Sequence, residues 1–116
     1  MRTNPVMMPA LKTSIWTYAL IRRAEIGGAY AALTQRGDGD AGAVLVKICT
    51  LDGNAVLYQP IRNMSGEQVW LPKGPLSERD IDDLIRKRKN TDPDMWVVEI
   101  EDKQGRHFLT EFVEET

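Results

Sequence analysis

The stretch that decides the fold is residues 92–109, DPDMWVVEIEDKQGRHFL. After the turn-forming DPD it carries an apolar run in which Trp96, Val98 and Ile100 share one face of an extended chain. A polar connection with a glycine follows, and the apolar character then returns. The pattern predicts a β-hairpin of two strands, 95–101 and 106–112.

A second hairpin is predicted in the middle of the chain. Residues 43–51 alternate, with Val44, Val46 and Ile48 on one face, and residues 55–58 form the returning strand. The Asp52-Gly53 dipeptide between them is typical of a two-residue type I′ turn, which needs positive φ at both positions. Further strands are expected at 29–35 and at 67–71, the second ended by Pro72, with a loop at 59–66.

One helix is predicted at residues 77–89. Ser77 can cap it, and Asp80 follows at the capping-box position. Apolar side chains on this segment form a narrow stripe, so the helix should lie on the sheet with most of its surface in solvent. Asn90 and then Pro93 end the helical pattern.

The segment at residues 15–26 allows two interpretations. Trp16, Ala19, Leu20 and Ala24 recur at helical spacing. The segment also fits a strand, because Trp16, Tyr18 and Leu20 alternate with the residues at 17, 19 and 21. We favour a helix, because Gly27 and Gly28 follow where a helix C-terminus prefers glycine.

These elements together predict an α+β domain. We expect a mainly antiparallel sheet of about five or six strands with two helices packed on it. The chain has 116 residues, the usual size of one domain. We assign residues 14–116 to that domain and expect residues 1–13 to be a flexible N-terminal segment.

Composition excludes several classes of protein. The net charge of −2 gives no general attraction to nucleic acid or to anionic membranes, so we expect neither as a partner. The first residues lack the apolar run of a secretory signal peptide, and no segment is long and apolar enough to span a bilayer. Cys49 is the only cysteine, which suits a reducing compartment. We therefore predict a cytoplasmic protein.

Three segments together resemble family 1491 of the domains of unknown function, a group of short alphaproteobacterial proteins. The first is Trp16 with ALIRR at 19–23, the second is RGDGDAGAVLV at 36–46, and the third is DPDMWVVEIED at 92–102 with GRH at 105–107. The resemblance implies a one-domain architecture that contains helices and strands. It implies no catalytic residues, because none are assigned in that family.

The best candidate for a ligand site is the loop at residues 36–42, RGDGDAG. Arg36 could hold a phosphate or carboxylate group, Asp38 and Asp40 could hold a cation, and the glycines up to Gly42 leave backbone N–H groups accessible. The spacing does not match an EF-hand, and a strand follows where a phosphate-binding loop would open a helix. The plainer interpretation is a strand connection whose glycines and aspartates serve turn geometry, and both interpretations stay open.

Other polar residues are explained more simply without a site. Cys49 and His107 occur once each, so a multi-histidine metal centre within one chain is excluded, and nothing in their spacing pairs them as nucleophile and base. The basic run at 86–89 suits the end of a helix dipole, and Glu99 and Glu101 suit a half-exposed strand. We predict no catalytic residues, no metal and no cofactor.

Two function classes follow. The first is a non-enzymatic protein-interaction module whose partner is an unknown protein or a second copy of the chain, because sheets of this size often leave an edge free to pair. The alternative is a binder or enzyme that holds a small anionic molecule on the loop at 36–42. Whether the chain is an enzyme is left open by the sequence.

Overall fold

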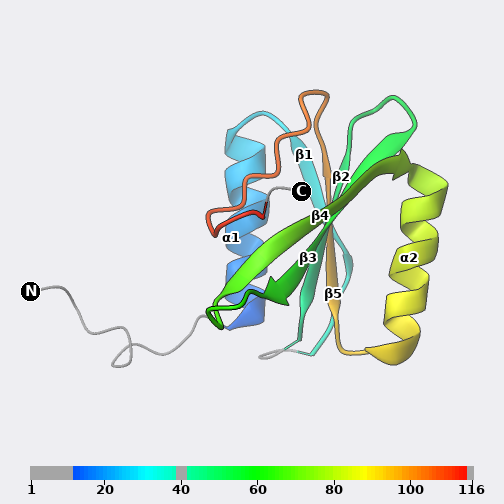
Figure 1. The fold of residues 1–116 in the computed structure, drawn as a ribbon. Coiled ribbons are helices and arrows are strands. Elements are labelled where there is room, and N and C mark those ends of the chain that lie inside the picture. The colour runs from blue at the N-terminus through cyan, green and yellow to red at the C-terminus, as the bar shows by residue number, and fades with distance from the viewer. Residues whose placement is uncertain (1–11, 39–41, 115–116) are drawn as a thin grey trace, which may run out of the picture.

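The computed structural model of the protein describes residues 12–38 and 42–114 (Figure 1). These residues form two helices and a five-stranded, mostly antiparallel sheet, so the predicted α+β class is confirmed. In chain order the elements are α1 (Thr13–Ile26), β1 (Tyr30–Gln35), β2 (Val44–Cys49), β3 (Asn54–Arg62), β4 (Gln68–Ser77), α2 (Glu78–Thr91) and β5 (Trp96–Glu101).

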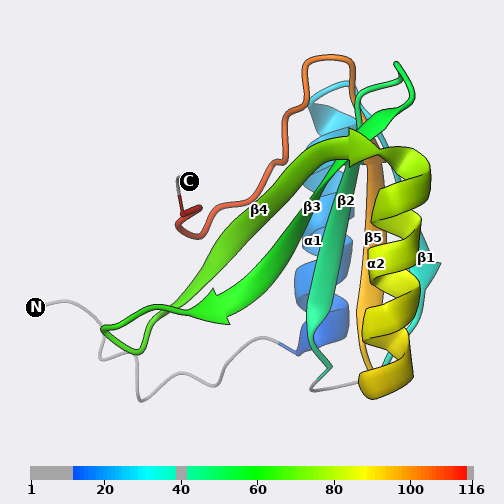
Figure 2. The same ribbon diagram turned by 45° about the vertical axis from the view of Figure 1, so that its right-hand side comes forward.

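The helices cover opposite faces of the sheet, with α1 on one side and α2 on the other (Figures 1 and 2). The strand order is β1-β5-β2-β3-β4, so β1 and β4 are the edges. The last strand, β5, lies between β1 and β2, antiparallel to the first and parallel to the second. The other neighbouring pairs, β2 with β3 and β3 with β4, are antiparallel.

Each face of the sheet has its own apolar core. On the α1 face, Leu20 and Ala24 pack against Val46, Trp96 and Val98. On the α2 face the core is built from Leu45, Leu57, Ile81, Met95 and Val97. Alternation along β2 and β5 therefore sends side chains to two cores instead of to one core and solvent, as expected for central strands.

The predicted hairpin of 95–101 with 106–112 is wrong in its second half. Both edges of β5 are already paired, so the following segment has no free edge of β5 to join. It crosses instead to the far end of the α1 face, where Val113 forms a single bridge with Trp70 of β4. The apolar residue Leu109 in this segment packs into the α1-side core, which explains its strand-like pattern without strand pairing.

The β3–β4 pair is longer than predicted. The expected loop at 59–66 is only partly correct, because β3 continues to Arg62, and the expected strand end at Pro72 is wrong, because β4 continues to Ser77. Proline is tolerated in β4 because it is an edge strand, whose outer side in the described ranges is met by another segment at Trp70 and not at its prolines.

The predicted two-residue type I′ turn at Asp52-Gly53 is also wrong. Gly53 has the expected positive φ of 91°, but the other positive φ, 64°, belongs to Leu51. The Asp52 carboxylate accepts hydrogen bonds from the Thr50 hydroxyl at 2.5 Å and the Asn54 backbone N–H at 3.0 Å. These bonds favour a longer loop between β2 and β3 than the dipeptide indicates.

Both helices form where the sequence predicts them. Residues 15–26 are helical, which decides between the two interpretations of that segment. Residues 1–11 of the predicted flexible segment lie outside the described residues, and Thr13 already belongs to α1. Neither helix in the described ranges is long and apolar enough to cross a membrane.

The cap of α2 gives a direct stability test. The Ser77 hydroxyl accepts a hydrogen bond from the Asp80 backbone N–H at 3.1 Å. Ser77→Ala should lower the free energy of unfolding by about 1 kcal/mol, because that N–H loses its acceptor, and Ser77→Asp should largely restore it. Urea denaturation measures both variants, and an unchanged midpoint for Ser77→Ala would contradict the assignment.

Candidate functional site

The predicted ligand loop begins where β1 ends, and its arginine is held by two aromatic residues. The Arg36 guanidinium lies over the Trp96 ring at 5.0 Å from the centroid, and its Nη1 donates to the Tyr18 hydroxyl at 3.0 Å. Trp96 is fully buried and Tyr18 is on α1. Arg36 therefore connects the loop to α1 and to Trp96, and these contacts explain its position without a bound ligand.

The described ends of this loop meet over Trp96. The Asp38 carbonyl accepts from the Trp96 indole N–H at 2.6 Å, and the Asp38 N–H donates to the Asp94 carbonyl at 3.0 Å. At Gly42 a Cβ would lie 2.1 Å from the Asp94 carbonyl oxygen, so glycine there serves close packing. Asp40 lies outside the described residues. These contacts favour a strand connection, and a ligand role for Arg36, Asp38, Asp40 and Gly42 stays a prediction.

Sequence reasoning missed a cluster of ionisable residues beneath α2. Its centre is Lys47 of β2, which is 4% exposed. Its Nζ donates to Asp82 at 2.7 Å and to Glu78 at 3.0 Å, and lies 3.5 Å from a Glu99 oxygen. A lysine in an otherwise apolar strand, with two acids one turn apart at the start of the next helix, is the signal that could have found it.

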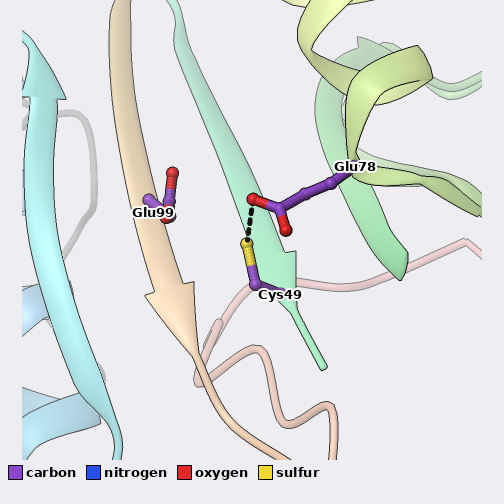
Figure 3. A group of neighbouring side chains, drawn as sticks. All are labelled: Cys49, Glu78 and Glu99. Atoms are coloured by element: carbon purple, nitrogen blue, oxygen red, sulfur yellow. Dashed lines mark hydrogen bonds between the residues drawn. The ribbon is translucent and has the colours of Figure 1, made fainter. Parts of the chain in front are cut away.

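Cys49 is the last member of the group, which we call the Lys47 cluster: Lys47, Cys49, Glu78, Asp82 and Glu99. Its side chain lies next to Glu78 and Glu99, with the thiol donating to Glu78 at 3.6 Å (Figure 3). Burial raises the pKa of the Cys49 thiol to about 12, and the negative charge of Glu99 adds to the effect. The thiol therefore keeps its proton at neutral pH and is a poor nucleophile.

The lysine charge is stable in this position. Burial works to lower the pKa of Lys47, but hydrogen bonds to Asp82 and Glu78 outweigh it, so the pKa is raised above its usual value. Ligand atoms of Cys49, Glu78 and Glu99 lie within 4.8 Å of one another, a spacing that could hold a metal ion. The ammonium group already supplies the positive charge between these carboxylates, so the cluster is best explained as an ion-pair network that fixes α2 to the sheet.

His107 lies on the opposite face from Cys49. Its Nδ1 accepts from the Leu109 N–H at 2.9 Å, and its ring contacts Tyr58, which packs against the α1-side core. Cys49 belongs to the α2-side core. The two residues are therefore not a nucleophile–base pair.

A different feature stands out on the outside of α1. Three large apolar side chains of this helix are more than half exposed: Ile15 at 52%, Tyr18 at 51% and Ile26 at 75%. Tyr30, the first residue of β1, is 64% exposed; its neighbour Ala31 packs in the α1-side core, so the Tyr30 side chain points to the other face of the sheet at this edge. We call the three exposed residues of α1, together with the outer edge of β1 that begins at Tyr30, the α1–β1 surface. The exposed large apolar residues elsewhere in the described ranges, Leu51, Met64 and Phe112, lie outside helices and strands.

The family model described as "Protein of unknown function (DUF1491)" matches residues 11–110, which is most of the chain. The chain belongs to the DUF1491 family. It is similar to the crystal structure of a DUF1491 family protein from Caulobacter crescentus CB15, with 50% identity and a TM-score of 0.84, over 90% of this chain and 100% of that one.

Two further solved structures agree with this DUF1491 fold. An NMR structure of a DUF1491 family protein from the same Caulobacter strain has 47% identity and a TM-score of 0.82, covering 93% of this chain and 100% of that one. The solution structure of protein Atu0922 from A. tumefaciens has 30% identity and a TM-score of 0.77, covering 91% and 98%. No curated protein matches the chain. The family supplies no function, so function must be argued from the surfaces and sites of the molecule.

From the Lys47 cluster we expect that replacing Lys47 lowers the free energy of unfolding by an amount that depends on pH. Lys47→Met leaves three carboxylates facing one another without a cation, and these are partly exposed, with Glu78 and Asp82 near 45%. Water can therefore reach them, and we expect a loss of about 2 kcal/mol at pH 7, less than the ~3–5 kcal/mol typical of a fully buried broken pair. Urea denaturation of both proteins measures this loss.

The difference between the two proteins should shrink at high pH. Because the folded pKa of Lys47 is raised, its stabilisation is complete below the pKa of an unfolded lysine, ~10.4, and declines as pH rises above that value. Lys47→Met lacks this dependence. A difference that is absent at pH 7, or that does not fall above pH ~10.4, would contradict the ion-pair interpretation.

Proposed function

We propose that this DUF1491 domain is a non-enzymatic protein-interaction module that binds its partner through the α1–β1 surface. The observation that carries the proposal is the exposure of Ile15, Tyr18 and Ile26 along one side of α1. Their spacing of three and then eight residues places them on a single helix face. That face is opposite the buried residues Leu20 and Ala24, so it points away from the domain's own core.

The contrast with α2 supports a specific use of this face. Both helices have 14 residues, but α2 exposes no large apolar side chain. Its apolar residues Ile81, Leu84 and Ile85 all turn toward the sheet. Single exposed apolar residues are common on any protein, whereas a row of them on one rigid helix is typical of a binding surface.

The neighbouring strand adds hydrogen-bonding capacity. Among the described strands β1 is an edge of the sheet and pairs with β5 on its inner side. Its outer backbone groups can accept a strand from a partner, which supplies register and affinity through main-chain bonds. A partner strand on β1 would lie beside Tyr30 and close to α1, because α1 packs on β1. Strand addition and apolar contact can therefore occur together.

The candidate chemistry elsewhere gives little support to an enzyme. Arg36 is held by Trp96 and Tyr18, and the Cys49 thiol stays protonated in a buried ion-pair network. An anionic ligand at the loop at 36–42 would have to compete with these contacts. The free cysteine is compatible with a reducing compartment, which supports our proposal of a cytoplasmic module.

The proposal is tested with a double variant and a matched control. Ile15→Lys with Ile26→Lys places two charges on the α1–β1 surface, and Met64→Lys places one on an exposed apolar residue between β3 and β4. All three substitutions are at exposed sites, so each should change stability by no more than ~0.5 kcal/mol. Sedimentation velocity measures self-association, and affinity capture from cells of the source organism measures other partners.

We expect the double variant to weaken association with the second copy or captured partner at least tenfold, which is about 1.4 kcal/mol. Met64→Lys should bind as the native chain does. If the double variant associates as strongly as the native chain, or if Met64→Lys is equally impaired, the α1–β1 surface is not the binding site.

A further inference from the structure

A cavity of about 680 Å³ lies on the other side of α1 from the α1–β1 surface. It opens to solvent between the start of α1, the start of β2 and the long β3–β4 pair, and the exposed side chain of Glu111 lines it from the C-terminal segment. Its size is that of a small-molecule site. The residues that matter for its chemistry are Thr13, Trp16, Gly42, Gln68, Trp70 and Glu111.

Two tryptophans and one carboxylate form a fixed unit in this Glu111 cavity. The rings of Trp16 and Trp70 are stacked, with centroids 5.5 Å apart and planes 24° apart. The Trp16 indole N–H donates to Glu111 Oε2 at 2.8 Å, and the Trp70 N–H donates to Oε1 at 3.1 Å. Because each ring is held by packing and by a hydrogen bond, the carboxylate has a defined position before any ligand arrives.

Glu111 stays negatively charged in this setting. Burial opposes its ionisation, but the hydrogen bonds from Trp16 and Trp70 outweigh burial and hold the pKa of Glu111 below its usual value. Each oxygen accepts one indole bond, and an ionised carboxylate has about four acceptor positions, so acceptor capacity remains for a ligand. Among the residues that the structure describes, no lysine or arginine lines the cavity or forms an ion pair with Glu111.

We propose that the Glu111 cavity binds an organic cation, an ammonium group carried on an apolar body. The carboxylate would pair with the charge, and the indole rings would hold the cation and its methylene or methyl groups by cation–π and apolar contact. Gly42, whose carbonyl accepts from the Thr13 hydroxyl at 3.3 Å, and Gln68, with its side-chain amide, also line the cavity and carry further acceptors. An anion would be repelled by Glu111, and a neutral ligand would leave its charge unmatched. The site is independent of the α1–β1 surface, which lies on the opposite side of the helix.

The test measures binding to the native chain with a charged probe and its neutral isostere. Choline and 3,3-dimethyl-1-butanol have nearly the same shape, and only choline carries a charge. Titrations are followed in ¹H–¹⁵N spectra through the indole N–H signals of Trp16 and Trp70. The backbone N–H of Ile81, which is fully buried on the α2 face of the sheet, serves as an internal control.

We expect choline to shift the Trp16 and Trp70 signals saturably, while the Ile81 signal stays in place and the neutral alcohol binds at least tenfold more weakly. Two further titrations distinguish a protein-borne amine from a free one: Nα-acetyl-lysine methylamide represents a lysine side chain, and spermidine represents a free amine. The probe that binds more tightly identifies which kind of amine the site takes. If no cation gives a saturable shift, or if the alcohol binds as tightly as choline, the proposal is overturned.

Variants separate a ligand role of Glu111 from its role in holding the C-terminal segment. Glu111→Gln removes the charge, and Gln68→Arg keeps Glu111 and its indole bonds but places a competing cation in the cavity. Both should weaken binding of the cation probe at least tenfold. Glu25→Gln, on an exposed part of α1, should bind as the native chain does. If Gln68→Arg folds and binds with native affinity, the cavity does not recognise charge through Glu111.

Discussion

The placement of β5 between β1 and β2 is the constraint on which the rest of the structure depends. β5 supplies side chains to both cores, with Trp96, Val98 and Ile100 on the α1 face and Val97 on the α2 face. Its parallel register with β2 sets Val46 beside Val98 and Lys47 beside Glu99. Because both of its edges are paired, β5 also forces the chain that follows it to leave the sheet.

That departure builds the second half of the α1 face. The segment after β5 places Leu109 in the core and then reaches β4, where the Trp70 N–H donates to the Phe112 carbonyl and the Trp70 carbonyl accepts from the Glu114 N–H. Figure 1 shows this segment on the same side of the molecule as α1. Glu111 thereby meets the two tryptophans, which come from α1 and β4. One topological choice thus leads to the stacked rings, the fixed carboxylate and the cavity beside them.

The two faces of the sheet use their polar residues differently. On the α2 face the Lys47 ammonium pairs with three partly exposed carboxylates, and α2 presents a charged outer surface to solvent. On the α1 side an apolar row remains exposed on one flank of the helix, and a carboxylate without a described cationic partner lies on the other. An exposed apolar row favours burial against a partner, and a carboxylate held in place by two indole N–H groups offers a fixed charge to an incoming cation, which is the physical reason to expect binding on the α1 side.

The sequence by itself determined the local elements, because their signals act over a few residues. Ser77 and Asp80 predicted the start of α2, the glycines after Ile26 predicted the end of α1, and the alternation in β2 and β5 predicted which side chains share a face. Only tertiary structure decided the partners of those strands. An apolar alternating strand looks alike whether its neighbour is the next segment or one fifty residues away, so the hairpin after β5 could not be excluded in advance.

Local sequence signals also could not show which residues of the candidate sites contact one another. The composition of the loop at 36–42 marked it as unusual, but only the fold showed that Arg36 and Asp38 engage Trp96. Lys47 and Glu111 looked like ordinary surface charges in the sequence. Their partners lie 31 and 95 positions away along the chain, in Glu78 and Trp16, and no local pattern encodes that distance. Burial and pairing are properties of the assembled sheet, and they gave these two residues their chemistry.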